Sequence, residues 1–185
     1  NPKITIYRIS TPASDVDVEK YTRIRLDALR TNPEAFSSTY ARDVHLTHED
    51  WRGRVNTPGR TTLAAHRKGA SIDAIGDEEE WIGTLSVLHP MMLHEKRGDL
   101  PSLPHLAAAV KEGNVERFLL VGMWVHPSVR GMGVGGMLIE NAVDVVRESP
   151  SEHSDGKEKA KIVFLDVCSA NENARKLYRK AGFVE

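Results

Sequence analysis

Hydrophobic and polar residues alternate along this chain with two periods, one typical of strands and one typical of helices. Apolar and polar positions alternate from Ile4 to Ile9, which predicts a strand. The next apolar positions have helical spacing and predict a first helix with a buried face: Val18, Tyr21, Ile24 and Ala28. This helix should end near Asn32-Pro33, because the residue before a proline disfavours helical dihedral angles.

The middle of the chain predicts a short helix and three strands. The helix is expected at 47–55, with Thr47 as its N-cap and Asp50 in its first turn. Strands are expected at 60–67 and 80–88, joined by a hairpin-like connection at 69–77. Residues 89–114 contain three prolines and predict an insert or long loop, in which 106–111 could form a helical turn. The apolar run "FLLVGMWV" at 118–125 predicts a central strand buried on both faces.

The last third predicts two helices separated by a strand. After a glycine-rich loop, apolar residues at helical spacing predict a helix that continues to about Arg147. A strand is expected at 162–167. Ser169 and Glu172 have the spacing of a capping box for a final helix that ends at Gly182. The order of elements indicates one α/β or α+β domain over residues 1–185.

Composition excludes several classes of function. The formal net charge is -1, so no excess of Lys and Arg favours nucleic acid as a partner. No apolar run approaches the roughly 20 residues that cross a membrane, so we expect no membrane partner. Cys168 is the only cysteine, which favours a reducing, cytoplasmic location and a role as a small buried apolar residue. The eight histidines show no metal-ligand spacing, and we expect no metal site.

The stretch "VRGMGVGG" at 129–136 has the composition of a phosphate-binding loop. Glycines expose backbone N–H groups, and the helix that follows adds the positive end of its dipole. The stretch matches both G-x-G-x-x-G, a dinucleotide pattern, and R-x-x-G-x-G, a pyrophosphate loop of acyl-CoA-dependent acetyltransferases. The dinucleotide pattern lacks its context, because five residues separate the apolar strand from Gly131 and the next acidic strand residue, Asp166, comes too late.

Two longer segments strengthen the acetyltransferase interpretation. The segment "MWVHPSVRGMGVGGMLIENAV" resembles motif A of the GNAT superfamily of N-acetyltransferases, through Val125, Pro127, Arg130, Gly131, Gly133 and Gly135. The segment "LDVCSANENARKLYRKAGF" resembles motif B of the same family, through Leu165, Val167, Asn171, Ala174, Leu177, Tyr178, Gly182 and Phe183. The order of the two motifs is that of the family.

The resemblance implies one GNAT-like domain with a mixed, mostly antiparallel central sheet flanked by helices. It implies direct transfer of an acetyl group from acetyl-CoA to a primary amine in a ternary complex. We expect a small-molecule acceptor and a monomer or homodimer. The alternatives are a protein N-terminal or lysine acetyltransferase and a non-catalytic acyl-CoA-binding domain. The family usually has another strand after Gly182-Phe183, whereas the given sequence ends at Glu185, so that strand is either missing here, dispensable or supplied by a neighbour.

The resemblance also implies a binding site for acetyl-CoA. The pyrophosphate would lie on the loop residues Arg130, Gly131, Met132, Gly133, Val134, Gly135 and Gly136. The pantetheine arm would lie beside the backbone of Met123, Trp124 and Val125, where one N–H would polarise the thioester carbonyl. Asn171 would bind CoA or a water, or would only cap the final helix.

The catalytic candidates follow from the chemistry of the transfer. Tyr178 is the candidate general acid for the leaving thiolate, and the alternative is that it belongs to an apolar helix face. Asp166 and Glu116 are the candidates for the general base. Both could instead be surface charges, because a chain of waters often serves as the base in this family.

Overall fold

The computed structural model describes residues 3–68, 80–93, 112, 115–151 and 159–185. The expected hairpin-like connection at 69–77 lies outside the described residues, as do most of the expected insert at 89–114 and its helical turn at 106–111. All other predicted elements can be compared with the structure.

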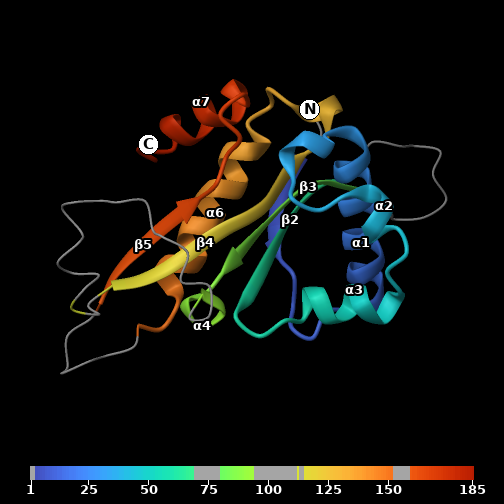
Figure 1. Ribbon diagram of the computed structural model, residues 1–185, viewed down its shortest axis with the longest axis horizontal. Coiled ribbons are helices and arrows are strands. Elements are labelled where there is room, and N and C mark those ends of the chain that lie inside the picture. Colours follow the sequence, from blue (N-terminus) through green and yellow to red (C-terminus); the bar gives the residue numbers. More distant parts are fainter. Residues whose placement is uncertain (1–2, 69–79, 94–111, 113–114, 152–158) are drawn as a thin grey trace.

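Five strands form one sheet in sequence order (Figure 1). The first three pairs of neighbouring strands are antiparallel, and the last pair, β4 and β5, is parallel. The expectation of a mixed, mostly antiparallel sheet in one α/β domain is therefore confirmed. The strands are β1 (Lys3–Arg8), β2 (Arg60–Lys68), β3 (Glu80–Leu88), β4 (Val115–Val125) and β5 (Ala160–Leu165).

Helices cover both faces of the sheet (Figure 1). One face carries α1 (Asp15–Thr31) and α3 (His48–Val55), and between them along the chain come η1 (Pro33–Ala35) and α2 (Tyr40–Asp43). The other face carries α6 (Val134–Glu148). The remaining described helices are α4 (Pro90–Leu93), η2 (Pro127–Val129) and α7 (Glu172–Lys180).

Each face of the sheet has its own hydrophobic core. Under α6, Leu138 of the helix packs with Phe118 of β4 in a buried cluster. On the opposite face, Val18 of α1 and Trp51 of α3 pack with Trp124 of β4. All four residues predicted to form the inner face of the first helix are buried, which confirms its pattern. The N-cap of α3 is also as predicted, because Thr47 and Asp50 form a capping box.

Three predictions about the later elements were wrong in detail. Strand β4 begins at Val115, three residues before the predicted start, and buried positions alternate along it with half-buried ones. It is not buried on both faces, because part of one face lines a cavity. Strand β5 ends at Leu165, two residues earlier than predicted.

The expected capping box of the final helix does not form. Helix α7 begins at Glu172 with Asn171 as its N-cap, whose side-chain oxygen accepts the N–H of Ala174 at 3.1 Å. The Glu172 carboxylate pairs with Arg175 and does not reach back to Ser169. Asn and Ser are equally good N-caps, and here the cap is Asn171, the one closer to the apolar positions of the helix.

Candidate active site

The two parallel strands separate within the sheet. Pairing between β4 and β5 ends at Leu120 with Leu165, whereas β4 continues to Val125. Among the residues that the structure describes, no strand therefore pairs with residues 121–125 on that side. A cavity of about 1370 Å³ opens along this part of β4. Unpaired N–H and C=O groups of a strand edge can bind an extended ligand as a strand would.

A β-bulge lies at the start of this open segment. Thr84 of β3 is opposite Trp124, but Ser86 is opposite Val121, so β4 contains one extra residue. Gly122 has a φ of 64°, a conformation that glycine adopts without strain. The extra residue changes which side chains face α6, from Phe118 and Leu120 before the bulge to Met123 and Val125 after it.

The glycine-rich loop supplies free backbone donors to the same cavity. Gly131 and Gly133 have φ values of 82° and 83°, and Gly133 is the N-cap of α6. The first intrahelical bond runs from Met137 N–H to the carbonyl of Gly133, at 3.1 Å. The amides before Met137 have no intrahelical acceptor, and no side chain caps them. Such amides, together with the helix dipole, form a site for an anionic group.

Arg130 fixes this loop to the rest of the site. Its Nε donates to the carbonyl of Val125 at 2.9 Å, and its Nη2 donates to Oδ1 of Asn32 at 2.6 Å. The same Asn32 oxygen accepts from Nε1 of Trp124 at 3.1 Å. One asparagine at the end of α1 therefore connects the loop, β4 and α1.

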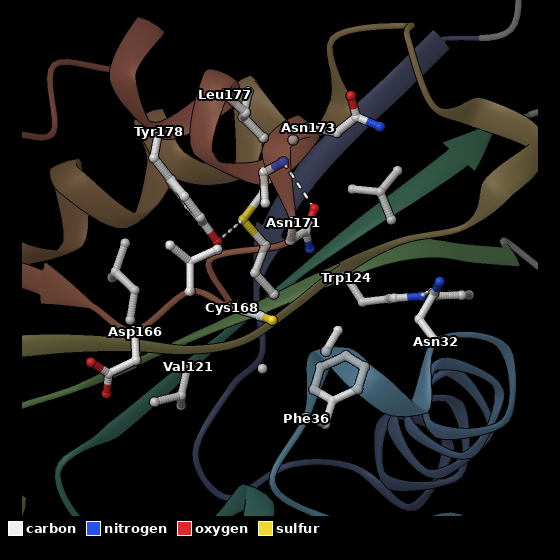
Figure 2. A pocket seen from close by; sticks show the side chains of 18 of the residues that line it. Asn32, Phe36, Val121, Trp124, Asp166, Cys168, Asn171, Asn173, Leu177 and Tyr178 are labelled. Atoms are coloured by element: carbon white, nitrogen blue, oxygen red, sulfur yellow. Dashed lines mark hydrogen bonds between the residues drawn. The ribbon is translucent and has the colours of Figure 1, made fainter. Parts of the chain in front are cut away.

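Tyr178 lies where α7 faces the open strand (Figure 2). Its hydroxyl donates to Sδ of Met123 at 3.3 Å, and its side chain is half-buried. Burial raises the pKa of the phenol above its ordinary value, so the group stays protonated at neutral pH. A protonated hydroxyl beside an unpaired strand edge is placed to donate a proton to a bound ligand.

Residues 35–183 match the model of the Acetyltransferase (GNAT) family. The chain belongs to the GNAT acetyltransferase family. No curated protein sequence is similar enough to the chain to count as a relative. Within the described residues, none of the helices combines the length and apolar character that a membrane crossing requires. The same residues include no group of three His, Cys, Asp or Glu side chains placed to hold a metal ion.

Solved structures show the same fold as this GNAT domain. Arabidopsis thaliana NAA60, solved in complex with acetyl-CoA, is 18% identical with a TM-score of 0.60, and the alignment covers 98% of this chain and 85% of that one. The aminoglycoside N-acetyltransferase AAC(6')-Iy, solved in complex with CoA, is 13% identical with a TM-score of 0.59, covering 100% and 90%. A Trypanosoma brucei acetyltransferase is 16% identical with a TM-score of 0.58, covering 99% and 94%.

Most residues predicted to bind the cosubstrate meet at the cavity of the GNAT domain. The lining includes Met123, Trp124, Val125, Arg130, Gly131, Gly133, Val134, Gly135, Gly136, Asn171 and Tyr178. Met132 is exposed and does not line it. Asn171 uses its side-chain oxygen as the cap of α7, so the capping alternative is the one visible in the structure.

The two candidate bases lie in different places. Asp166 follows β5 and lines the cavity, with an exposed side chain (Figure 2). Glu116 is buried near the other end of β4, accepts a bond from Ser151 Oγ at 3.2 Å and does not line the cavity. Cys168 also lines the cavity and is exposed, so the expectation that it is a buried apolar residue was wrong.

Sequence reasoning missed one group of cavity residues. Arg25 of α1, Arg54 of α3 and Arg60 of β2 line the cavity, although Arg60 comes 35 positions after Arg25 in the sequence. No motif marks them, and charged residues on helices usually face solvent. One local signal is that Arg25 comes four residues after Tyr21 and three before Ala28, so it shares the buried face of the helix.

Proposed function

We propose that this GNAT domain transfers an acetyl group from acetyl-CoA to a primary amine of a small molecule. The observation that supports it most is the shared cavity, where the unpaired edge at residues 121–125 meets the uncapped amides at the start of α6. An extended arm that ends in a pyrophosphate needs both features at once. NAA60 and AAC(6')-Iy were solved with acetyl-CoA and CoA respectively.

The chain's residues divide the binding of acetyl-CoA between two surfaces. Backbone amides of residues 130–136 would hold the pyrophosphate, and the open edge at 123–125 would bind the pantetheine amides. The side chain of Arg130 already donates to Val125 and Asn32, so it orders the loop whether or not another of its N–H groups reaches a phosphate.

The proposed reaction needs one acid and one base. The amine nitrogen attacks the thioester carbonyl carbon, a C–N bond forms, and the C–S bond breaks. An N–H of the β4 edge stabilises the oxyanion, and Tyr178 gives its proton to the leaving thiolate. Asp166, directly or through water, accepts the proton that the ammonium group loses before the attack. The second N–H proton, lost as the amide forms, returns to Tyr178 directly or through water. Asp166 takes precedence over Glu116 because it lines the cavity.

The first experiment measures thermal stability with acetyl-CoA, with NADH as the control for the dinucleotide pattern. A ligand at 100 times its Kd adds about 2.7 kcal/mol to the free energy of unfolding. Stabilisation by acetyl-CoA alone, followed by amine-dependent release of free thiol, is the expected result. If acetyl-CoA stabilises the protein but no amine causes it to release free thiol, the non-catalytic alternative is favoured. Stabilisation by NADH alone would overturn the proposal.

A further inference from the structure

One end of the cavity is lined by arginines, and we call Arg25, Arg54 and Arg60 the arginine end. They come from three elements, α1, α3 and the start of β2. Nη1 of Arg60 donates to the backbone carbonyl of Arg54 at 3.4 Å. The ring of Phe36 lies 4.4 Å from the guanidinium carbon of Arg25 and covers one of its faces. Three cations therefore share one side of the space beside β4.

The described residues neutralise these cations only in part. Asp43 is fully buried, and it accepts from Nη1 of Arg54 and from Nε of Arg42, each at 2.9 Å. Its negative charge is therefore already shared by two arginines. Arg25 and Arg60 form no ion pair with a described residue, and one guanidinium nitrogen of each is buried without a hydrogen-bond partner.

A partly buried arginine without a counter-charge lowers the stability of the fold, and an anionic ligand would remove this cost. Burial lowers the pKa of Arg25, and the like charges of Arg54 and Arg60 add to that effect, although Tyr21 and Asp43 act in the opposite direction. A guanidinium group remains charged in proteins and presents a planar set of donors that fits a carboxylate. An anionic group on the ligand would supply the missing counter-charge.

The position of Arg25 limits how far this anion lies from the reacting amine. A methyl group on Gly122 would be 3.8 Å from Nη1 of Arg25, so the guanidinium is adjacent to the bulge. Under the proposed function, on which this inference rests, the thioester carbonyl lies at the same part of β4. We propose that the acceptor carries a carboxylate close to its amino group, as an amino acid does, and that Arg25 and Arg60 bind this carboxylate.

Matched pairs of acceptors test the substrate class. The whole chain is assayed for free thiol release from acetyl-CoA with the standard amino acids and with the carboxamide of each. Phosphoethanolamine and ethanolamine form a second pair, which separates a carboxylate from a phosphate. We expect the best amino acid to exceed its carboxamide in kcat/KM by about 10- to 100-fold, the range for hydrogen bonds to a charged group.

Variants then test the assignment to residues. Arg25→Gln and Arg60→Gln should each reduce the preference for the amino acid over its carboxamide by about 10-fold or more, mainly through KM. Arg23→Gln is the matched control, because Arg23 is an exposed residue of the same helix that does not line the cavity. Thermal stabilisation by acetyl-CoA is measured for every variant, because it shows that the variant is folded and keeps its cosubstrate site.

The outcomes separate this proposal from the proposed function. If acetyl-CoA binds and carboxamides, ethanolamine or phosphoethanolamine are acetylated in preference to amino acids, the carboxylate proposal is wrong while the proposed acetyltransferase activity stands. If acetyl-CoA binds but none of these amines is acetylated, the carboxylate proposal is wrong and the non-catalytic alternative is favoured. If the preference survives in both arginine variants, the residues are wrongly assigned. If acetyl-CoA does not bind, both proposals fall.

Discussion

At the scale of single residues, the most informative position is Tyr178. Its hydroxyl is half-buried, protonated and in contact with Met123 of the open strand. The sequence allowed two interpretations, a general acid or a residue of an apolar helix face. The structure shows that the ring packs at the edge of α7 while the hydroxyl points to the cavity (Figure 2), so one side chain can combine both.

Replacement of Tyr178 by phenylalanine tests its catalytic role. We expect kcat to fall by about 10²- to 10⁴-fold, the usual contribution of a general acid, with acetyl-CoA affinity nearly unchanged. Because burial raises the pKa, loss of the proton from Tyr178 should not reduce wild-type activity until pH exceeds about 10. The measurement is a pH profile of kcat for both proteins. An unchanged kcat in the variant would mean that Tyr178 serves packing alone.

Gly135 occupies a position where a side chain would come too close to its neighbours. A Cβ at this position would lie 2.8 Å from Cδ2 of Leu177 and 3.1 Å from Cε of Met123. Gly135→Ala should therefore force the ends of the Leu177 and Met123 side chains to move, and we expect it to lower the free energy of unfolding by about 1 kcal/mol. Gly53→Ala is the control, because its Cβ meets nothing within 4 Å and alanine favours a helix interior.

Urea unfolding of the two alanine variants measures this difference. The control should be as stable as the wild type or more stable by up to about 1 kcal/mol. Equal stability of both variants would show that the Leu177 and Met123 side chains move aside without cost. The motif comparison had identified Gly135 as part of a binding loop, but its contact with Leu177 depends on the tertiary structure.

At the scale of elements, the ion pairs around Asp43 connect α2 with α3. Burial alone would raise the pKa of Asp43, but hydrogen bonds from Arg54 and Arg42 outweigh burial and hold the pKa below its ordinary value of 3.8. The charged carboxylate therefore stabilises the fold at pH values above the pKa that Asp43 has in the unfolded state. This contribution is lost as pH falls through the folded-state pKa.

Asp43→Asn should lower the free energy of unfolding by about 3 kcal/mol at pH 7, the usual cost of breaking a buried ion pair. The difference in stability between variant and wild type should narrow as pH falls below about 4, because Asp43 of the unfolded wild type then binds a proton while the folded protein does not; the narrowing ends below the folded-state pKa. Asp27→Asn is the matched control, since Asp27 forms an exposed pair with Arg30 that contributes little. Denaturant titrations at several pH values measure this difference in the free energy of unfolding. A difference that does not change with pH would contradict the interpretation.

The sequence predicts elements well where one residue type decides the outcome. Pro33 ended α1, and Thr47 with Asp50 began α3 as expected. At the start of α7, Ser169 and Asn171 were both suitable caps, and the structure uses Asn171. Strand limits were less certain because pairing partners determine them.

At the scale of the whole molecule, the sequence indicated the family and the cosubstrate side of the cavity but not the opposite side. Motif residues are contiguous, so a short pattern contains most of the loop and the open strand. The arginine end is assembled from α1, α3 and β2, whose side chains meet only in the folded domain. Asn32 was missed for the same reason, since its bonds to Trp124 and Arg130 span more than 90 positions.

The division of the cavity also bears on how such a protein can be redesigned. Its cosubstrate side comes from residues 121–136 and 171–178, whereas the arginine end comes from residues 25–60. Under the two proposals made above, substitutions at the arginine end would diversify the accepted amine without replacing a residue of the cosubstrate side. A mutant library restricted to Arg25, Phe36 and Arg60, which leaves the ion pair of Arg54 with Asp43 intact, is a compact starting point for laboratory evolution of new acceptors.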